Sequence, residues 1–252
     1  MALIKAVVFD FIGTLTSVRG YSLEASKMKL YNAIVSMGFK VDVDSFMQAY
    51  SHAHEKHRLI RYEQLVEVTN AVWTAEALQT LGFNVQQDDG RVKAAVNVFF
   101  EDYVRSLELN AGTQQLLKEL SGRYKLGLIS NFTYAPVIYA GLRKLGISCF
   151  FNAVSVSQAV GWRKPSERIF THTLRCLGVS AEEAIYVGDS PFEDVEGAAA
   201  VGMKTVFIPS QFCSMRDLQE SGRKPDFVVS CVRELHDRFP SIVKSLGCQR
   251  QR

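Results

Sequence analysis

The chain begins with the stretch LIKAVVFDFIGTLT, residues 3–16, which indicates the kind of fold to expect. Residues 3–9 form a nearly continuous apolar run that stops at Asp10. Such a run is typical of a strand buried on both faces, because helices cover both sides of a parallel sheet. Asp10 would then lie at the carboxyl end of a parallel strand, which is where open α/β sheets bind their ligands.

The second half of the chain alternates between helical patterns and short apolar strands. Strands are expected over residues 125–130, 153–156, 184–187, 204–208 and 226–229. Helices are expected over residues 112–120, 135–145, 166–177, 191–201 and 232–246. This alternation predicts βα units and a parallel sheet, to which the first strand also belongs.

The block between these parts has a purely helical pattern. Its apolar spacing predicts helices over residues 22–38, 62–81 and 91–107, together with a helix that Asp44 caps. Because the block separates the first strand from all the others, the simplest arrangement is a helical domain inserted into an α/β core.

The predicted fold class is therefore α/β, with a Rossmann-like parallel sheet core and an inserted all-helical cap domain. We expect the core to comprise residues 1–16 and 107–246 and the cap residues 17–106. Residues 247–252 form a polar end that we expect to be a flexible tail.

The composition limits the classes of protein that the chain can belong to. With 252 residues, 47% of them hydrophobic and 22% charged, it can bury a large core without disulfide or metal support. We expect no membrane partner and no signal peptide, because no apolar run reaches the ~18 residues of a membrane span and no cleavage site follows the first strand. A net charge of +3 is too small to imply a nucleic-acid partner. Five cysteines without a CxxC pair disfavour a disulfide framework and suggest a reducing, cytoplasmic location.

Several polar side chains collect at the expected strand ends or in the loops beside them. They are Asp10, Ser130, Asn131, Lys164, Asp189 and Asp194. Taken singly, each has a plainer interpretation, since Asp189 could cap a helix and Asp194 could be an acid that favours a helix dipole. Their recurrence at one edge of one sheet favours a functional site.

The chain resembles the haloacid dehalogenase superfamily of hydrolases in four short motifs. They are DFIGTLT at residues 10–16, LISN at 128–131, GWRKP at 161–165 and VGDSPFED at 187–194. The order and spacing of the motifs match the family, and the helical block occupies the position of the family's cap domain. Each motif alone would be a weak signal, whereas the four in order are strong evidence for the fold.

The resemblance implies a role for each motif. Asp10 would be the nucleophile, and Lys164 would balance the charge of Asp10 and of a phosphate. Thr14, Ser130 and Asn131 would bind the transferred group. A carboxylate held rigidly at a strand end suits this chemistry, because it can attack phosphorus or carbon directly.

A cation is needed as well, because the nucleophile and a phosphate repel each other. Mg²⁺ suits this task, since it takes oxygen ligands from one or two carboxylates and keeps several waters. Asp10, Asp189 and the backbone carbonyl of Ile12 are the expected ligands. Asp194 would hold a metal-bound water or orient its neighbours.

Position 12 departs from the phosphatase pattern of the family, which has a second aspartate there to protonate the leaving group. Ile12 cannot transfer a proton, and a positioned acid or base is typically worth about 10²–10⁴-fold in rate. The leading hypothesis remains a Mg²⁺-dependent phosphatase that acts on a small phosphorylated metabolite through an aspartyl-phosphate on Asp10. The alternatives are a dehalogenase-like hydrolase, a phosphonatase-like hydrolase with Lys56 forming a Schiff base, and a protein that binds a phosphorylated ligand without turnover. The oligomeric state stays open between a monomer and a homodimer.

The helical block contains one polar cluster, consisting of His52, His54, Glu55, His57, Arg58 and Arg61, of which His54, His57, Arg58 and Arg61 are the candidate site residues. His54 and His57 are three residues apart, so they can share a helix face. Such a face could supply a proton or bind an anionic substrate. The simpler interpretation is a solvated polar face of a helix.

Overall fold

The computed structural model describes residues 3–248 and contains a central sheet of six parallel strands. The strand order is β5-β4-β1-β6-β7-β8, and every neighbouring pair is parallel. The strands are β1 (Ala6–Phe9), β4 (Lys125–Ser130), β5 (Ala153–Val156), β6 (Ala184–Gly188), β7 (Lys204–Phe207) and β8 (Phe227–Val228). The predicted fold class is confirmed.

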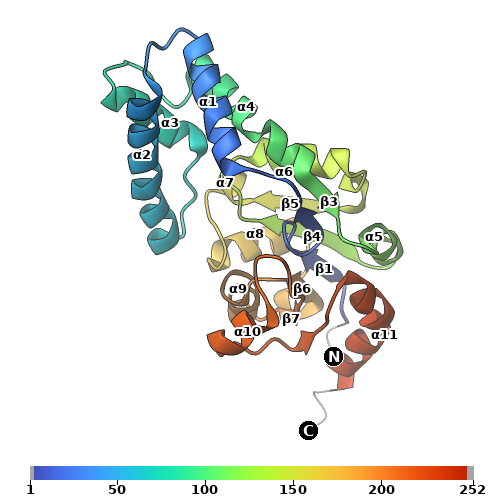
Figure 1. Cartoon of the computed structure of the whole chain (residues 1–252). Helices are drawn as coiled ribbons and strands as arrows, with labels where there is room; N and C mark the ends of the chain where they lie inside the picture. Colours follow the sequence, from blue (N-terminus) through green and yellow to red (C-terminus); the bar gives the residue numbers. More distant parts are fainter. Residues whose placement is uncertain (1–2, 249–252) are drawn as a thin grey trace.

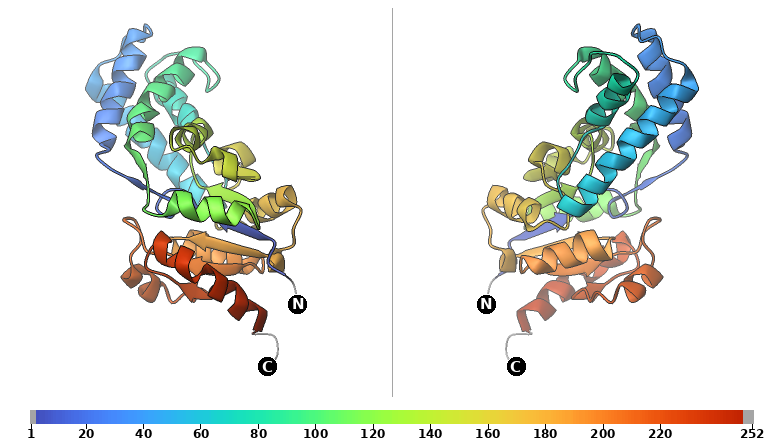
Figure 2. Two further views of the ribbon diagram at one scale, coloured as in Figure 1. Left: turned by 90° about the vertical axis from the view of Figure 1, so that its right-hand side faces the viewer. Right: turned by 90° about the vertical axis from the view of Figure 1, so that its left-hand side faces the viewer.

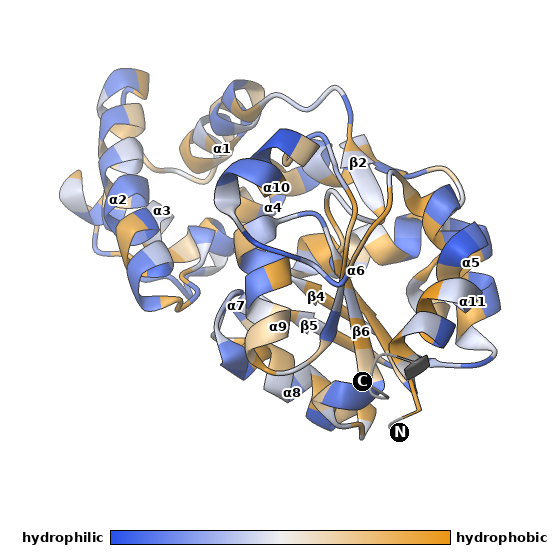
Figure 3. Ribbon diagram, turned by 90° about the horizontal axis from the view of Figure 1, so that it is seen from below, coloured by the Kyte–Doolittle hydropathy of each residue, from blue (hydrophilic) through white to orange (hydrophobic). Residues whose placement is uncertain are grey.

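Helices cover both faces of the sheet (Figure 1). They are α5 (Thr113–Ser121), α6 (Ala135–Lys144), α7 (Ser157–Val160), α8 (Glu167–Leu177), α9 (Gly197–Ala200), α10 (Met215–Ser221) and α11 (Val232–Cys248). In β1, Val7 and Phe9 pack with α5, α6 and α11 on one face, whereas Ala6 and Val8 pack with α8 and α9 on the other. This double burial explains why the strand is apolar at every position. Figure 3 shows the hydrophobic strands β4 and β6 between helices with hydrophilic stretches.

The cap consists of four helices with a hydrophobic core of their own. They are α1 (Leu23–Ser36), α2 (Val43–Gln64), α3 (Asn70–Thr80) and α4 (Gly90–Ser106). A two-stranded antiparallel ribbon of β2 (Thr16–Val18) and β3 (Leu107–Leu109) joins the cap to the core. Figures 1 and 2 show the cap helices as a separate body on one side of the sheet.

The cap differs from expectation in how its helices begin and end. Asp42, not Asp44, caps α2, and its carboxylate accepts a hydrogen bond from the backbone N–H of Ser45 at 3.0 Å. Asp44 lies in the first turn, where it favours the helix dipole. The expected helix over residues 62–81 is interrupted, because α2 ends at Gln64, the C-cap residue Leu65 is left-handed, and α3 begins only at Asn70.

The interruption has a physical reason. The extended segment after α2 pairs with the core loop that precedes Lys164. Arg163 donates its backbone N–H to the Leu65 carbonyl at 3.0 Å, and Glu67 donates its own to the Gly161 carbonyl, also at 3.0 Å. A continuous helix could not present these backbone groups sideways to the core.

Two further boundaries differ. The chain was expected to be helical from residue 17, but Thr16–Val18 is strand β2, which is too short to show an alternating pattern. The tail expected over residues 247–252 begins inside α11, which runs to Cys248, and residues 249–252 lie outside the described part of the chain. Among the described helices, none has the length and apolarity needed to cross a membrane.

Candidate active site

The carboxyl ends of the two central strands bring two carboxylates together. Asp10 follows β1 and Asp189 follows β6, and these strands pair in parallel with Phe9 opposite Val187. Lys164 enters from the loop between α7 and α8, and Asp194 comes from a π-helical turn, η3 (Pro191–Glu196). All four side chains are buried. The structure therefore gathers these four expected site residues in one place.

Lys164 is the centre of this cluster. Its Nζ lies 2.7 Å from Asp10 Oδ1, 2.6 Å from Asp194 Oδ1 and 3.1 Å from the Tyr186 hydroxyl. Burial alone would lower the pKa of Lys164, but the carboxylates of Asp10 and Asp194 outweigh it and raise that pKa well above its usual value. The lysine is therefore protonated and offsets the two buried anions.

Asp194 uses both carboxylate oxygens within the protein. Oδ2 accepts the backbone N–H groups of Asp189 at 3.1 Å and Ser190 at 2.9 Å, and Oδ1 accepts from Lys164 and from Tyr186. A Cβ at Gly188 would lie 2.4 Å from the Asp194 carboxyl carbon, so only glycine lets the strand end approach this closely. Asp194 thus holds the loop that carries Asp189.

Asn131 lies beside Lys164, but its amide is already engaged. Its Oδ1 accepts the backbone N–H of Lys164 at 2.8 Å, and its Nδ2 donates to the Lys164 carbonyl at 3.0 Å. This two-way contact fixes the backbone of Lys164. Ser130, the last residue of β4, lines the same cavity as Asp10.

Thr14 lies next to the site but holds a protein group. Its Oγ1 donates to Asp189 Oδ1 at 3.3 Å, and the residue is fully buried. Ser210 donates to the other oxygen of Asp189 at 2.5 Å. We did not anticipate Ser210 or Tyr186 from the sequence. Ser210 follows β7 closely, so the strand-end argument that found Asp189 could have found it.

The carboxylate cluster suits a cation. Asp10 Oδ2 is buried and has no hydrogen-bond partner among the residues that the structure describes. Oxygens of Asp10, Asp189 and Asp194 all lie within 4.8 Å of one another. Burial and then the Asp194 charge raise the pKa of Asp189 to about 6, and burial raises the pKa of Asp10 well above its usual value. Added positive charge beside these carboxylates would favour their ionised forms.

The nucleophile loop approaches Asp189 closely. Gly13 has a φ of 107°, and a Cβ there would lie 2.3 Å from Asp189 Oδ2. Glycine is therefore required both by the backbone conformation and by the space available. The close approach places the Ile12 backbone beside the carboxylate cluster.

A cavity of about 420 Å³ opens above these groups. Asp10, Ile12, Lys164 and Asp189 line it from the core, and the cap contributes Tyr62 and Tyr103. Ile12 thus lines the cavity, and its side chain cannot donate a proton to a leaving group. The lining also contains Glu193, whose carboxylate pairs with Arg163 at 3.1 Å.

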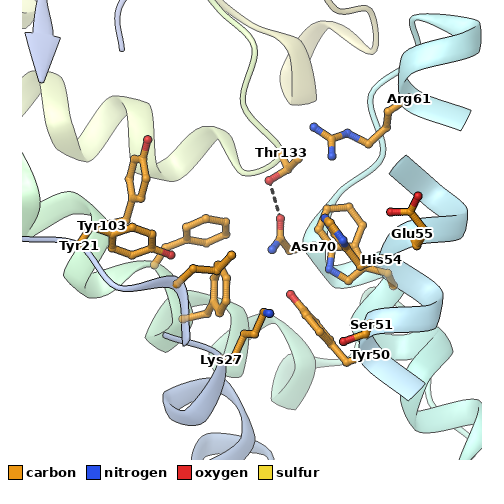
Figure 4. A pocket seen from close by; sticks show the side chains of 14 residues that line it. Tyr21, Lys27, Tyr50, Ser51, His54, Glu55, Arg61, Asn70, Tyr103 and Thr133 are labelled. Carbon is orange, nitrogen blue, oxygen red and sulfur yellow. Dashed lines mark hydrogen bonds between the residues drawn. The ribbon is translucent and has the colours of Figure 1, made fainter. Parts of the chain in front are cut away.

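The expected cap cluster is divided between two places. His57 contacts Glu76 at 2.6 Å and Arg58 contacts Glu55 at 2.7 Å, and neither lines the Asp10 cavity. Lys56 pairs with Glu76 at 2.7 Å and does not line that cavity either. His54 and Arg61 line a second cavity, inside the cap (Figure 4).

A buried ion-pair network docks the cap onto the core. Glu67, whose side chain is fully buried, accepts hydrogen bonds from Arg61 Nε at 2.6 Å and from Ser157 Oγ at 2.5 Å. Its carboxylate also lies 3.7 Å from Arg163 Nη1. Because Arg163 directly precedes Lys164, the cap is tied to the loop that carries the site lysine.

A parallel α/β sheet with a carboxylate at the end of β1, a buried lysine and two further carboxylates defines a class of hydrolases. The model of the haloacid dehalogenase-like hydrolase family matches residues 4–202. The chain belongs to this family and is a hydrolase.

Individual relatives align over nearly the whole chain. The glyceraldehyde 3-phosphate phosphatase of Methanopyrus kandleri is 28% identical over 255 residues, which cover 96% of this chain and 100% of the relative. The ribulose-1,5-bisphosphate 5-phosphatase of Halopiger xanaduensis is 25% identical, with 92% of this chain and 98% of the relative covered. Among solved structures, the 2-haloacid dehalogenase from Pseudomonas syringae pv. tomato DC3000 has a TM-score of 0.68 at 20% identity, covering 96% of this chain and 99% of that one. This last likeness concerns the fold alone.

Proposed function

We propose that the chain is a Mg²⁺-dependent phosphatase that acts on a small phosphorylated metabolite through an aspartyl-phosphate on Asp10. The observation that carries this proposal is the state of the Asp10 carboxylate. Lys164 holds one oxygen at 2.7 Å, and the other is buried without a partner. Relatives named for glyceraldehyde 3-phosphate and ribulose-1,5-bisphosphate support a phosphate ester as substrate.

The reaction would proceed in two steps. An Asp10 oxygen attacks phosphorus, the bond from phosphorus to the leaving oxygen breaks, and the alcohol departs with a proton from solvent. Water then cleaves the acyl phosphate, which releases inorganic phosphate and restores the carboxylate. Lys164 stabilises the negative charge that develops between Asp10 and the phosphoryl oxygens.

The residues present fit a magnesium ion. Asp10 Oδ2, Asp189 and the Ile12 carbonyl would hold it, and Asp194 would keep Asp189 in position through the loop backbone. When bound, the ion neutralises the charge of the nucleophile and of the phosphate.

Ile12 restricts the substrates that such an enzyme can use. Without a proton donor at this position, esters whose leaving group departs readily as an anion are favoured over alkyl esters. Binding without turnover is the second candidate, and Ile12 is the observation that favours it. A phosphonatase-like reaction through Lys56 is not proposed, because Lys56 pairs with Glu76 outside the cavity.

The test is phosphate release from a panel of phosphate monoesters and acyl phosphates, with and without Mg²⁺. We expect Mg²⁺-dependent release by the native chain and none by the Asp10→Asn variant. Release that Asp10→Asn leaves unchanged contradicts the mechanism, and tight binding of phosphate esters without release supports the second candidate. A cytoplasmic location and a monomeric or homodimeric state also stay predictions.

A further inference from the structure

The cap contains a second cavity, of about 470 Å³, that adjoins the Asp10 cavity. Tyr103 lines both cavities, and the consecutive residues Phe132 and Thr133 line one each. The pKa of Tyr103 is raised by burial first, then by Tyr21 and then by the Asp10 carboxylate. This order agrees with a position between the Asp10 cavity and the cap cavity. Tyr103 therefore lies between the Asp10 cavity and the cap cavity.

The walls of the cap cavity are mainly aromatic. They include Tyr21, Tyr50, Trp73, Phe99 and Phe100. Rings arranged in this way favour a flat apolar body, since aromatic pairs contribute beyond the area they bury. The volume lies within the range typical of small-molecule sites.

Several polar groups that line this cavity can donate hydrogen bonds. Figure 4 shows Lys27 Nζ, the Asn70 amide, the Tyr50 hydroxyl and the Arg61 guanidinium directed toward its centre. Thr133 Oγ1 donates a hydrogen bond to the side-chain oxygen Oδ1 of Asn70 at 2.5 Å. The side-chain N–H groups of Asn70 therefore face the cavity.

The charges of the lining favour an anion. Within residues 3–248, the one ion-pair partner of Lys27 is Glu24, whose side chain is 78% exposed, and such a pair is weak in water. Glu55, the acid of the lining, is held by two hydrogen bonds from Arg58. Burial and then Arg61 lower the pKa of His54, which disfavours a positive charge on this histidine and leaves Lys27 and Arg61 as the cationic side chains of the lining.

We propose that the cap cavity binds the leaving group of the substrate, and that this group is an aromatic alcohol that carries a carboxylate. The aromatic body packs between the rings, and the carboxylate accepts hydrogen bonds from Lys27 and Asn70. This inference rests on the proposed phosphatase function. A second observation agrees with it: an aromatic alcohol leaves readily as an anion, which suits a site where Ile12 replaces the proton donor.

Two matched esters test the proposal. 4-(2-Carboxyethyl)phenyl phosphate carries the carboxylate, and 4-propylphenyl phosphate replaces it with a methyl group while keeping the ring. We expect kcat/KM to be at least about tenfold higher for the carboxylate ester, because a hydrogen bond to a charged group contributes this much. Equal values for the two esters overturn the proposal.

Two variants locate the effect. Lys27→Met removes the cation from the cavity, and Lys29→Met is its control, because Lys29 lies on the same helix and pairs with Asp102 outside the lining. Lys27→Met should lower kcat/KM about tenfold for the carboxylate ester and leave the propyl ester unchanged, and Lys29→Met should change neither. An equal loss for both esters in Lys27→Met contradicts the assignment.

Measurements of ester binding distinguish a failure of this inference from a failure of the proposed function. If the native chain hydrolyses neither ester, the phosphatase proposal fails for this class of substrate. The affinities of both esters for the Asp10→Asn variant, measured by calorimetry, then decide the inference. Tighter binding of the carboxylate ester that Lys27→Met abolishes supports it, and equal binding of the two esters contradicts it.

Discussion

Lys164 and Asp10 form a buried ion pair, with Nζ 2.7 Å from Oδ1, in which the lysine also contacts Asp194 at 2.6 Å. One buried cation is thus shared between two buried carboxylates. Each partner is expensive to bury alone, so the cluster is stable only when it is complete. The chemistry of the site and the stability of the core consequently depend on the same residues.

The Lys164→Met variant tests this dependence. It leaves Asp10 and Asp194 without their cation, so we expect the free energy of unfolding to fall by about 3–5 kcal/mol. Urea denaturation measures the loss. The double variant Lys164→Met/Asp194→Asn should recover part of it, and a loss below about 1 kcal/mol in the single variant would contradict the account.

Asp189 gives a prediction about pH. Its pKa is raised to about 6 in the folded state from 3.8, so the folded chain binds the proton more tightly than the unfolded chain does. Its contribution to the stability of the cation-free protein is therefore lost as the pH rises from about 4 to about 6. Asp189→Asn should raise the Tm of the cation-free protein at pH 7.5 by several degrees and flatten this pH dependence.

Magnesium extends the same measurement. Saturating Mg²⁺ should raise the Tm of the native chain, because an ion that binds only the folded state stabilises that state. The shift should disappear in Asp189→Asn and persist in Asp237→Asn, which changes an exposed carboxylate. An equal Mg²⁺ shift in the native chain and in Asp189→Asn would refute Asp189 as a ligand.

Asn131 is a positioning residue for Lys164. Asn131→Ala removes both hydrogen bonds to the Lys164 backbone, and the free energy of unfolding should fall by about 1–3 kcal/mol. We expect kcat to fall by about 10²-fold with little change in KM, because a misplaced lysine acts on the transition state. A rise in KM with an unchanged kcat would instead show that Asn131 binds substrate directly.

The sequence predicted the part of the site that depends on strand ends. The bounds of β4 and β5 agree with expectation, and Asp10, Lys164, Asp189 and Asp194 meet as their positions in parallel βα units require. The apolar pattern of the sequence shows where each strand ends, and parallel βα units bring these strand ends to one edge of the sheet.

The remainder depends on contacts between distant loops. Asn131 and Thr14, which are expected to bind the transferred group, also form hydrogen bonds to Lys164 and Asp189, partners that no local pattern reveals. The interruption after α2 has the same origin, because Glu67 leaves the helix to reach Arg163 and Ser157. Helix periodicity also could not show that His54 and His57 face different surroundings.

Ile12 can be tested by restoring an acid. Ile12→Asp should raise kcat/KM for alkyl phosphate esters, by up to about 10²-fold, and should change aryl esters much less, since aryl leaving groups need little protonation. Phosphate release from glycerol phosphate and phenyl phosphate measures the two effects. A fall for both esters would show that the chemistry has adapted to the apolar side chain.

The central claim is that Asp10 becomes phosphorylated during turnover. The most direct measurement is mass spectrometry of the peptide of residues 6–19. The reaction with a phosphate ester that the enzyme turns over is quenched with acid before the peptide is analysed. We predict a gain of one phosphoryl group on Asp10, present only while substrate remains and absent from Asp10→Asn. Turnover without any phosphoryl group on this peptide, or with the group on another residue, would contradict the account.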